Sequence, residues 1–402
     1  MLTLAEALDR LTAAVSPLDA AEMVPTFDAF GRILAEDVRS TLDVPPADNT
    51  AMDGYALRSA DVPAEGTVLP VSQRIPAGQV PSALQPGTAA RIFTGAQIPE
   101  GADAVVMQEL CEALDGAVRI NTVPPAGLSI RRRGEDVREG AAVLRAGDRL
   151  TPQAMGLAAS VGIAKLKVAR RPKVALFSTG DELVMPGEPI KPGAIYNSNR
   201  FLLRGLIEAL GGECVDLGIV PDKLDATRDA LRRAAQGADL IVTSGGVSVG
   251  EEDHLKPAVQ AEGSLDLWQI ALKPGKPLAF GHVKRADGTT AAFIGLPGNP
   301  VSSFVTFLLA VRPVLLRMLG VKDLAPRAIE MRADFDWPKA DKREEFLRAK
   351  LNAQGGLDLF PNQGSGVLTS AVWADGLVAN PPGRTIARGD VVRFLSFPEL
   401  MR

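Results

Sequence analysis

The stretch ADLIVTSGGVSVGEEDH, residues 238–254, is the part of the chain that decides the fold. Its apolar run at 238–242 is typical of a buried strand, and glycines, hydroxyls and then three consecutive carboxylates at 251–253 follow it. Glycines and hydroxyls suit a bound phosphate, whereas carboxylates repel one. The stretch therefore predicts a strand that ends in a ligand-binding loop, and it leaves open which ligand needs both kinds of group.

Strands and helices alternate on both sides of this stretch. Apolar, partly β-branched runs predict strands at 174–178, 214–220, 239–246 and 291–296. Helical patterns cover 198–212, 224–238 and 300–319. Such alternation implies right-handed βαβ units and a parallel sheet, and continuous apolar strands fit a sheet covered on both faces. We predict a doubly wound, mostly parallel α/β domain.

The regions that flank this domain differ in composition. Leucines at helical spacing predict an N-terminal helix over residues 2–16. Residues 45–145 are rich in proline and glycine and contain short β-prone pieces, which predicts a mostly β module with many turns. From Pro326 on, short strands separated by glycine-rich turns predict a small C-terminal β domain. A chain of 402 residues is expected to form several domains.

Composition disfavours several classes of function. The net charge of −4 and the low aromatic content of 5% argue against a nucleic-acid binder, which usually has a basic domain or a base-stacking surface. Only two cysteines, Cys111 and Cys214, and two histidines, His254 and His282, occur. These numbers are too low for a disulfide framework or a cysteine-built zinc site, and they disfavour a Ser-His-Asp hydrolase.

Neither secretion nor membrane insertion is indicated. The N-terminus MLTLAEALDR lacks the basic and apolar regions of a signal peptide. Arg312, Pro313 and Arg317 interrupt the apolar run at 301–311 before it reaches the roughly 20 residues that span a bilayer. We expect a cytoplasmic protein that binds neither nucleic acid nor membrane.

Glycine-containing loops follow three of the predicted strands. The loops are TGDEL at 179–183, SGGVSVGEED at 244–253 and LPGNPVSS at 296–303. In a doubly wound sheet, ligands bind outside the carboxyl ends of the strands, where glycines let backbone N–H groups approach an anion. One such loop could be an ordinary turn, but three at one sheet edge predict an anion or nucleotide site.

The segment KPGKP at 273–277 adds two lysines to this prediction. Lys273 and Lys276 flank a Pro-Gly pair that blocks helix formation, so a stiff turn is expected to carry both ammonium groups. The chain has neither a Walker A pattern nor the spaced glycines of dinucleotide folds. The turn therefore suits a phosphate or oxyanion, although a solvated basic turn is the alternative.

Carboxylates follow the same predicted strands. Asp181 and Glu182 lie in the first loop, Asp222 follows the strand at 214–220, and 251–253 are all acidic. Two bare carboxylates about 4 Å apart repel by roughly 4 kcal/mol at an effective dielectric constant near 20. A divalent cation would remove this repulsion, and Mg²⁺ prefers such oxygen ligands together with substrate phosphates. We predict a Mg²⁺ site, while a role at a helix N-terminus is the alternative for each acid.

The N-terminal half contributes two further motifs. In PPADNTAMDGYALR at 45–58, Asp53 lies in a tight turn before Gly54, and in RIFTGAQIPEGADAVVMQE at 91–109, Thr94 ends a strand. Both motifs could be ordinary turns.

Taken together, these motifs resemble a known family. NTAMDGYALR, FTGAQIPEGADAVVMQE, GEDVREG, STGDEL, TSGGVSVGEED, KPGKPLAFG and GLPGNPVSS occur in the order seen in the MoeA family of molybdopterin molybdotransferases, which includes the E domain of gephyrin. The resemblance extends from about residue 40 to 320. It implies an N-terminal helix and split linker domain at 1–44 plus 146–169, a β-rich lobe at 45–145, an α/β molybdopterin-binding domain at 170–325 and a C-terminal β domain at 326–402.

The resemblance also implies an activity and an assembly. Adenylylated molybdopterin and molybdate would give molybdenum cofactor, with release of AMP and a requirement for Mg²⁺. The chain would form a homodimer whose pockets lie between the α/β domain of one protomer and the β-rich lobe of its partner. The molybdopterin adenylyltransferase and cofactor-accepting enzymes are further possible partners.

The site residues that the motifs imply fall into two groups. The expected catalytic residues are Asp53, Glu182, Asp222 and Asp253, with Asp222 and Asp253 as metal ligands. The expected substrate-binding residues are Thr94, Asp136, Gly180, Ser244, Gly245, Gly246, Lys273, Lys276, Pro297, Pro300 and Arg343. Gln269 stands where the family often has a basic residue, and Arg348 in the motif REEFLR is a second candidate arginine.

Two alternative functions are open at this point. One is a non-catalytic scaffold, as in the E domain of gephyrin. The other is a molybdopterin adenylyltransferase, which shares the α/β domain but is expected to lack the β-rich lobe and the C-terminal domain.

Overall fold

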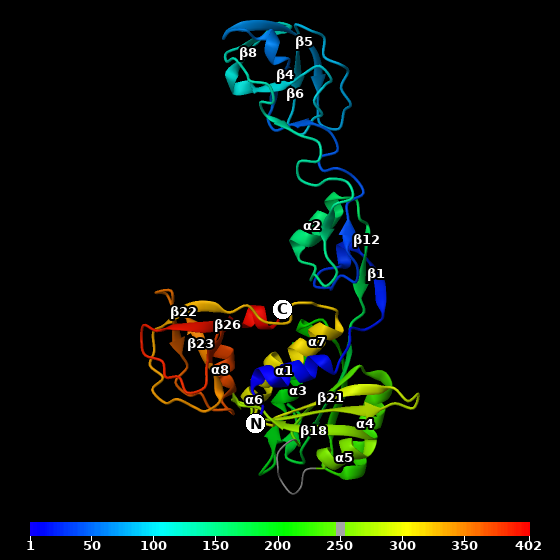
Figure 1. Ribbon diagram of the computed structural model, residues 1–402, viewed down its shortest axis with the longest axis vertical. Coiled ribbons are helices and arrows are strands. Elements are labelled where there is room, and N and C mark those ends of the chain that lie inside the picture. The colour runs from blue at the N-terminus through cyan, green and yellow to red at the C-terminus, as the bar shows by residue number, and fades with distance from the viewer. Residues whose placement is uncertain (247–253) are drawn as a thin grey trace. The chain divides into compact units, whose positions relative to one another are not determined.

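The structure is a computed structural model that describes residues 1–246 and 254–402. The chain forms two compact units (Figure 1). The first unit comprises Met1–Glu22, Gly31–Ala35 and Val168–Arg402, and the second comprises Met23–Phe30 and Glu36–Lys167. Strands β1 (Ala21–Pro25) and β12 (Lys165–Ala169) pair with each other and span the boundaries between the units.

A six-stranded sheet is the centre of the first unit. Its order is β16 (Glu213–Val220), β13 (Lys173–Thr179), β17 (Leu240–Ser244), β21 (Thr290–Leu296), β20 (Pro277–Lys284) and β18 (Gly263–Gln269). The first four strands are parallel, and β20 and β18 are antiparallel additions. The predicted doubly wound, mostly parallel fold is therefore confirmed.

Alternate residues of the central strands enter two separate cores. Val174 and Leu176 of β13 face one core, whereas Ala175 and Phe177 face the other. Side chains of successive residues in a strand point to opposite faces of the sheet, so a strand covered on both faces must be apolar throughout. This explains why these strands appear in the sequence as continuous apolar runs.

Helices cover both faces of this sheet (Figure 1). Side chains from α1 (Leu4–Ala13), α3 (Ser198–Ala209), α6 (Pro300–Thr306) and α7 (Arg312–Met318) enter the first core. Side chains from α4 (Leu224–Gly237) and α5 (Leu255–Glu262) enter the second. The side chain of Thr3 caps α1 in a capping box with Glu6, and the side chain of Asn197 caps α3.

The longest apolar helix is a core helix. Helices α6 and α7 continue through η4 (Phe307–Val311), a π-helical turn that precedes Pro313, which has no N–H for a helical hydrogen bond. The combined helix Pro300–Met318 is apolar and long enough to cross a membrane by length and composition, but 94% of its apolar 18-residue window is buried inside the protein. The charged and proline residues in it therefore did not end the helix, and burial in the core explains its apolar character.

A small β barrel follows this helix. Strands β22 (Ile329–Ala333), β23 (Glu344–Leu351), β24 (Gly356–Leu359), β25 (Gly376–Asn380) and β26 (Val391–Ser396) form a sheet that closes because β25 pairs with both β26 and β23. The short helices α8 (Leu368–Trp373) and α9 (Phe397–Leu400) complete it. The predicted C-terminal β region is confirmed as a sheet with its own apolar core.

The second unit is mostly β structure. Its main sheet has the order β7 (Ala104–Met107), β4 (Gly54–Leu57), β6 (Ala89–Ile92), β5 (Thr67–Ile75), β9 (Ala117–Ile120) and β8 (Cys111–Leu114). Two small sheets pair β3 (Asn49–Thr50) with β10 (Ile130–Arg131) and β2 (Val38–Arg39) with β11 (Ala142–Leu144). The remaining elements of the unit are α2 (Pro152–Ser160) and the short 3-10 helices η1 (Thr26–Asp28), η2 (Ser59–Asp61) and η3 (Gln108–Leu110).

Some features differ from the sequence-based expectations. Strands β18 and β20 were not predicted, although the residues of β18 alternate between polar and apolar, as is usual in an edge strand. Helix α1 packs against α7 in the first unit. The division of the chain into four regions stays a prediction.

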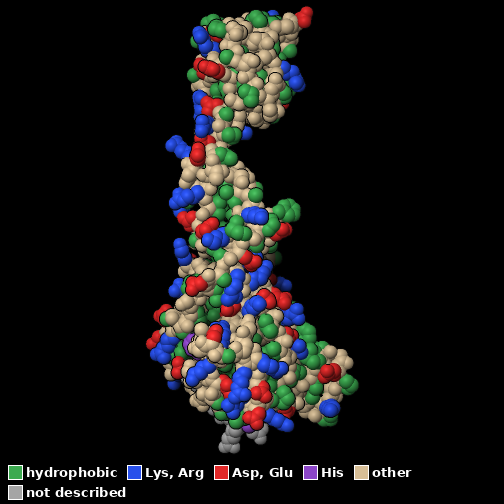
Figure 2. Space-filling view, turned by 90° about the vertical axis from the view of Figure 1, so that its right-hand side faces the viewer, with side chains coloured by type: hydrophobic (Ala, Val, Ile, Leu, Met, Phe, Trp, Pro, Cys, Tyr) green, Lys and Arg blue, Asp and Glu red, His purple; other side chains and the backbone are tan. Residues whose placement is uncertain are grey.

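The face drawn in Figure 2 shows Lys and Arg side chains interspersed with Asp and Glu side chains. This distribution agrees with the near balance of 44 basic and 48 acidic residues in the sequence.

We expect the Phe177→Ala substitution to lower the free energy of unfolding of the first unit by roughly 3–5 kcal/mol, because it leaves a cavity between the sheet and α4. Tryptophan fluorescence during denaturation reports on this unit alone, since it holds Trp268, Trp337 and Trp373. The control is Phe201→Ala on α3, where the ring is 56% exposed and the expected change is within about 1 kcal/mol. Equal effects of the two substitutions would contradict the assigned core.

Candidate functional site

Three parallel strands end together at one edge of the central sheet. In the parallel register, Ser178 of β13 pairs with Ser244 of β17, which pairs with Leu296 of β21. The loops that follow therefore begin side by side, as the sequence predicted for the glycine-containing segments. This edge is where ligands bind in open α/β sheets.

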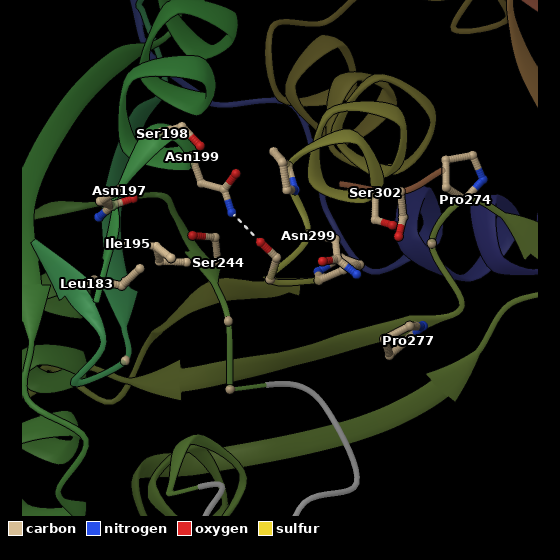
Figure 3. A pocket seen from close by; sticks show the side chains of 18 of the residues that line it. Leu183, Ile195, Asn197, Ser198, Asn199, Ser244, Pro274, Pro277, Asn299 and Ser302 are labelled. Carbon is tan, nitrogen blue, oxygen red and sulfur yellow. Dashed lines mark hydrogen bonds between the residues drawn. The ribbon is translucent and has the colours of Figure 1, made fainter. Parts of the chain in front are cut away.

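A cavity of about 780 Å³ lies at this edge (Figure 3). Most of the predicted site residues line it. These are Gly180, Glu182, Asp222, Ser244, Gly245, Gly246, Lys273, Lys276, Pro297, Pro300 and Arg343. The structure thus brings together residues from six separate segments of the first unit.

Close packing makes two of the loop glycines necessary. A Cβ on Gly245 would lie 2.9 Å from the carbonyl oxygen of Thr179, and one on Gly246 would lie 2.9 Å from Thr179 Oγ1. Both glycines also have positive φ values, of +91° and +68°. Side chains are excluded here on two grounds, so only glycine lets the loop pack this closely against Thr179.

Buried polar groups form the inner wall of the cavity. The hydroxyls of Ser178 and Ser244 lie 3.2 Å apart, and Asn199 Nδ2 donates to the carbonyl oxygen of Gly298 at 2.8 Å (dashed in Figure 3). Asn197 and Asn199 line the cavity, and neither was predicted as a site residue from the sequence. Asn197 caps helix α3, since its Oδ1 accepts from the Arg200 N–H at 3.2 Å.

The KPGKP turn is joined to the C-terminal barrel. Strand β19 (Leu272–Lys273) lies parallel to β23 and extends the barrel's sheet, with Lys273 paired to Glu345. A Cβ on Gly275 in this turn would lie 2.3 Å from Thr306 Oγ1 of α6. The turn is therefore held between the barrel and the core helix, which agrees with the predicted stiffness.

Lys273 is paired with carboxylates in the first unit. Its ammonium lies 2.9 Å from Glu345 Oε1 and 3.3 Å from Asp341 Oδ2. Burial alone would lower the pKa of Lys273, but the hydrogen bond and charge of Glu345, with those of Asp341, raise it above its usual value. Lys273 is therefore charged at neutral pH and already has two acidic partners, so its role as a substrate ligand stays a prediction.

Glu345 is a fully buried carboxylate with several hydrogen-bond donors. Besides Lys273, Trp337 Nε1 donates to its Oε2 at 2.8 Å, and Asn380 Nδ2 lies 3.3 Å from the same oxygen. A buried charge is tolerated when it is paired and hydrogen-bonded in this way.

The neighbouring arginine of this network also has a partner. Arg343 lies 2.9 Å from Asp341 Oδ2. Hydrogen bonds from Arg343 hold the pKa of the Asp341 carboxyl well below its usual range. Lys276, by contrast, is exposed at the cavity, and its ammonium has no ion-pair partner among residues 1–246 and 254–402.

The predicted metal ligands are only partly described. Asp222 lines the cavity, where its backbone N–H donates to Asp181 Oδ1 at 3.1 Å, and Glu182 lines it as well. Asp253 lies outside the described residues. Within the described ranges, no group of three or more His, Cys, Asp or Glu side chains could hold a metal ion. The Mg²⁺ site stays a prediction.

Three predicted residues lie in the second unit. Asp53 Oδ1 accepts from the N–H of Thr94 at 2.7 Å and from its hydroxyl at 2.6 Å. These bonds hold the pKa of Asp53 below its usual value. Asp136 is exposed, and its backbone N–H donates to the carbonyl oxygen of Val44. The structure therefore brings Asp53 and Thr94 into direct contact.

Further cavity residues come from the barrel and were not predicted. Gln363, Gly364 and Ser365 line the cavity. Arg348 lies behind them, only 1% exposed, and donates to the carbonyl oxygen of Gly364 at 3.2 Å. Burial without a carboxylate lowers the pKa of Arg348 to about 10, so the side chain is still charged at neutral pH. The segment NQGSG at 362–366 has turn composition, but no feature of it pointed to the site.

Gln269 ends β18 and is exposed. Its carbonyl oxygen accepts from the N–H of Leu2 at 2.8 Å. It does not line the cavity as the structure describes it.

Comparisons with family models cover most of the chain. Residues 2–162 match the MoeA N-terminal region (domain I and II). Residues 175–317 match a probable molybdopterin binding domain, and residues 330–397 match the MoeA C-terminal region (domain IV).

Similar proteins and structures match along the whole chain. The molybdopterin molybdenumtransferase of Haemophilus influenzae is 38% identical over 408 residues, which cover 100% of both chains. The protein of the same name from Nostoc sp. is 38% identical and covers 94% of this chain and 89% of its own. A crystal structure of the molybdopterin biosynthesis MoeA protein from Pyrococcus horikoshii OT3 has a TM-score of 0.86 at 30% identity, and covers 99% of this chain and 100% of that one.

We expect the loss of Lys273 to cost more stability than the loss of the charge on Glu345. Lys273→Met leaves Glu345, with a side chain only 1% exposed, without its cation and is expected to cost roughly 3–5 kcal/mol of stability. Glu345→Gln leaves Lys273, which is 38% exposed, in contact with water and is expected to cost about 1 kcal/mol.

Denaturation of both variants and of the double variant, followed by tryptophan fluorescence, measures the coupling. We expect the double variant to be more stable than Lys273→Met alone, because the buried charge is gone. The matched control is Lys276→Met, an exposed lysine, with an expected change within about 0.5 kcal/mol. If the stability losses of the two single variants simply add up in the double variant, the proposed pairing of Lys273 with Glu345 is wrong.

Proposed function

Because the chain belongs to the MoeA family, we propose that it acts as a molybdopterin molybdenumtransferase in molybdenum cofactor biosynthesis. In the proposed reaction, adenylylated molybdopterin and molybdate give molybdenum cofactor and AMP. Molybdate is a substrate of this reaction. The family membership supports the reaction class, and the features of the cavity support the roles of individual residues.

The observation that carries the proposal is the mixed chemistry of the cavity. One edge presents the glycine loop at Gly245 and Gly246, and the KPGKP turn presents the exposed ammonium of Lys276. The same cavity contains the carboxylates of Glu182 and Asp222. A substrate that carries phosphate and also needs a divalent cation would use both groups of residues.

The chain's own residues would bind and orient the substrates. The Gly246 N–H and the Lys276 ammonium would hold anionic oxygens by charge-assisted hydrogen bonds, whereas the Gly245 N–H donates to the carbonyl oxygen of Leu296. Arg343, which Asp341 keeps in place at 2.9 Å, would present its remaining N–H donors to an oxyanion. Fixed donors of this kind lower the reorganisation that the reaction requires.

Mg²⁺ fits the donor set of this edge in chemical type. Glu182 and Asp222 supply carboxylate oxygens at the cavity, and Asp222 together with Asp253 would hold the ion. When bound, Mg²⁺ would neutralise charge on the phosphate oxygens of the substrate.

We further propose that each pocket is shared between two protomers of a homodimer. Asp53 and Thr94 form one hydrogen-bonded pair in the second unit, while the glycine loops and lysines belong to the first. The proposal is that Asp53 and Thr94 complete the pocket of the partner. The molybdopterin adenylyltransferase and cofactor-accepting enzymes are proposed as further partners in the cytoplasm.

The alternative functions receive less support. A molybdopterin adenylyltransferase is expected to lack the β-rich lobe and the C-terminal domain, whereas this chain matches family models for both MoeA terminal regions. A purely non-catalytic scaffold gives no reason for carboxylates, a lysine and glycine loops to converge on one cavity. Turnover by the purified protein distinguishes the scaffold from the enzyme.

Removal of Mg²⁺ with a chelator is expected to abolish cofactor synthesis, and added Mg²⁺ to restore it. In Asp222→Asn, half-maximal activity should require at least about tenfold more Mg²⁺, because one carboxylate ligand is lost while the side-chain shape is kept. The control is Asp225→Asn, an exposed residue in the first turn of α4, which should behave like the wild type. An unchanged Mg²⁺ requirement in Asp222→Asn would remove this residue from the metal site.

Mixing two inactive variants tests the shared pocket. Asp53→Ala and Asp222→Ala chains alone should have little activity, but subunit exchange should restore it, because one pocket of each heterodimer receives neither substitution. Random pairing makes about half of the dimers heterodimers, so recovery should approach roughly a quarter of the wild-type sites. If verified exchange restores nothing, each pocket is built within one chain.

A further inference from the structure

A stack of two guanidinium groups on one phenyl ring lies on the main sheet of the second unit. Arg74 of β5 has its guanidinium carbon 4.4 Å from the centre of the Phe93 ring, and that of Arg91 of β6 lies 4.6 Å from the same centre. Arg91 also lies over the ring of Tyr55 of β4, at 5.2 Å. We call Arg74, Arg91, Phe93 and Tyr55 the arginine–aromatic cluster.

The sheet register builds this cluster. Arg74 is the register partner of Arg91 on the parallel neighbour strand, and Tyr55 is the partner of Arg91 on the antiparallel one. Side chains of register partners lie on the same face of a sheet, so these three side chains form one row across β5, β6 and β4. Phe93, two residues after Arg91, emerges on that same face.

The two arginines differ in their remaining contacts. Arg91 is only partly exposed, and its NH1 donates to the carbonyl oxygen of Gly54 at 2.9 Å while its NH2 donates to Gln108 Oε1 at 2.6 Å. Arg74 is exposed, and its guanidinium makes neither a hydrogen bond nor an ion pair with any residue that the structure describes. Arg91 is therefore held in place by its hydrogen bonds, whereas the N–H donors of Arg74 are available to a ligand.

Among residues 1–246 and 254–402, no carboxylate is in direct contact with the cluster. Both hydrogen bonds of Arg91 go to neutral oxygens, and the nearby Asp53 is engaged by the N–H and hydroxyl of Thr94. The Gln108 side chain links Glu109 to the cluster, since its Nε2 donates to Glu109 Oε1 at 3.3 Å while its Oε1 accepts from Arg91. Two like charges on one ring repel each other, and an anion bound there would offset this repulsion. The charge of Arg91 also acts on the Asp53 carboxyl, where it adds to the effect of the Thr94 hydrogen bonds in lowering the pKa.

From this geometry we propose that the arginine–aromatic cluster is a phosphate-binding site, and that Arg74 contacts the nucleotide phosphate of the adenylylated substrate. The planar guanidinium, oriented by the Phe93 ring, offers two parallel N–H donors to phosphate oxygens. Thr94 follows Phe93 directly, so the site adjoins the Asp53–Thr94 pair. The identity of the substrate rests on the proposed function, but the phosphate chemistry does not.

Binding of AMP to the full-length protein, measured by titration calorimetry, tests the proposal. Arg74→Gln should weaken AMP binding about tenfold, which corresponds to roughly 1.4 kcal/mol. Arg74→Lys keeps the positive charge but lacks the planar pair of N–H donors, so its affinity for AMP should lie between those of the wild type and Arg74→Gln. The matched control is Arg119→Gln, an arginine of the same sheet whose ion pair is with Glu112, and it should bind AMP like the wild type.

Adenosine serves as the probe without phosphate. Its binding should not respond to Arg74→Gln, and an equal loss for adenosine and AMP would overturn the phosphate assignment. Wild-type affinity for AMP in Arg74→Gln would overturn the site altogether. An assay of cofactor synthesis distinguishes failure of the phosphate site from failure of the proposed function. If the wild type turns over and Arg74→Gln has an unchanged KM, the proposed function stands and the assignment of the phosphate site is wrong. If AMP binding depends on Arg74 but the wild type shows no turnover, the phosphate site is supported and the proposed function is wrong.

Discussion

The parallel register of β13, β17 and β21 is the constraint on which the cavity depends. Because Ser178, Ser244 and Leu296 lie in one row, the loops after them leave the sheet at the same level. The close approach of Gly245 and Gly246 to Thr179 then follows from the spacing of neighbouring strands. A slip of one strand by a single residue would turn its apolar side chains to the wrong core and separate the loops.

A second pairing brings the barrel to this edge. Strand β19 consists of only two residues, yet it joins the KPGKP turn to β23 and places Lys273 beside the buried Glu345. The cations of the cavity therefore differ in their environment. Lys273 and Arg343 are held by carboxylates of the barrel, whereas Lys276 remains exposed. The barrel is therefore part of the site and also a support for it.

The second unit contains polar contacts of a different kind. Thr94 holds Asp53 through two hydrogen bonds, and the neighbouring arginine–aromatic cluster carries positive charge with no carboxylate of the described residues in contact. The proposed reaction gives these groups a common purpose, since a substrate with several charged parts needs both cationic and anionic contacts. The segment at 238–254 combines glycines with carboxylates for the same proposed reason, since the substrate would carry phosphate and need a divalent cation.

The sequence by itself determined the central fold and most of the cavity. Continuous apolar runs such as 174–178 predicted buried parallel strands because a strand covered on both faces has no solvent side, and the glycines after them predicted where the ligand would bind. Motif order was enough to indicate the family. These features are local in the chain, so periodicity and spacing record them directly.

Only the tertiary structure decided which charges are available. KPGKP looks symmetric in the sequence, but Lys273 meets Glu345 and Asp341 from a segment about 70 residues later, while Lys276 does not. Asn197, Gln363 and the stack of Arg74 and Arg91 on Phe93 were likewise not predicted. Ion pairing and stacking depend on distances of a few ångströms between residues far apart in the chain, and such distances exist only once the strands are in register.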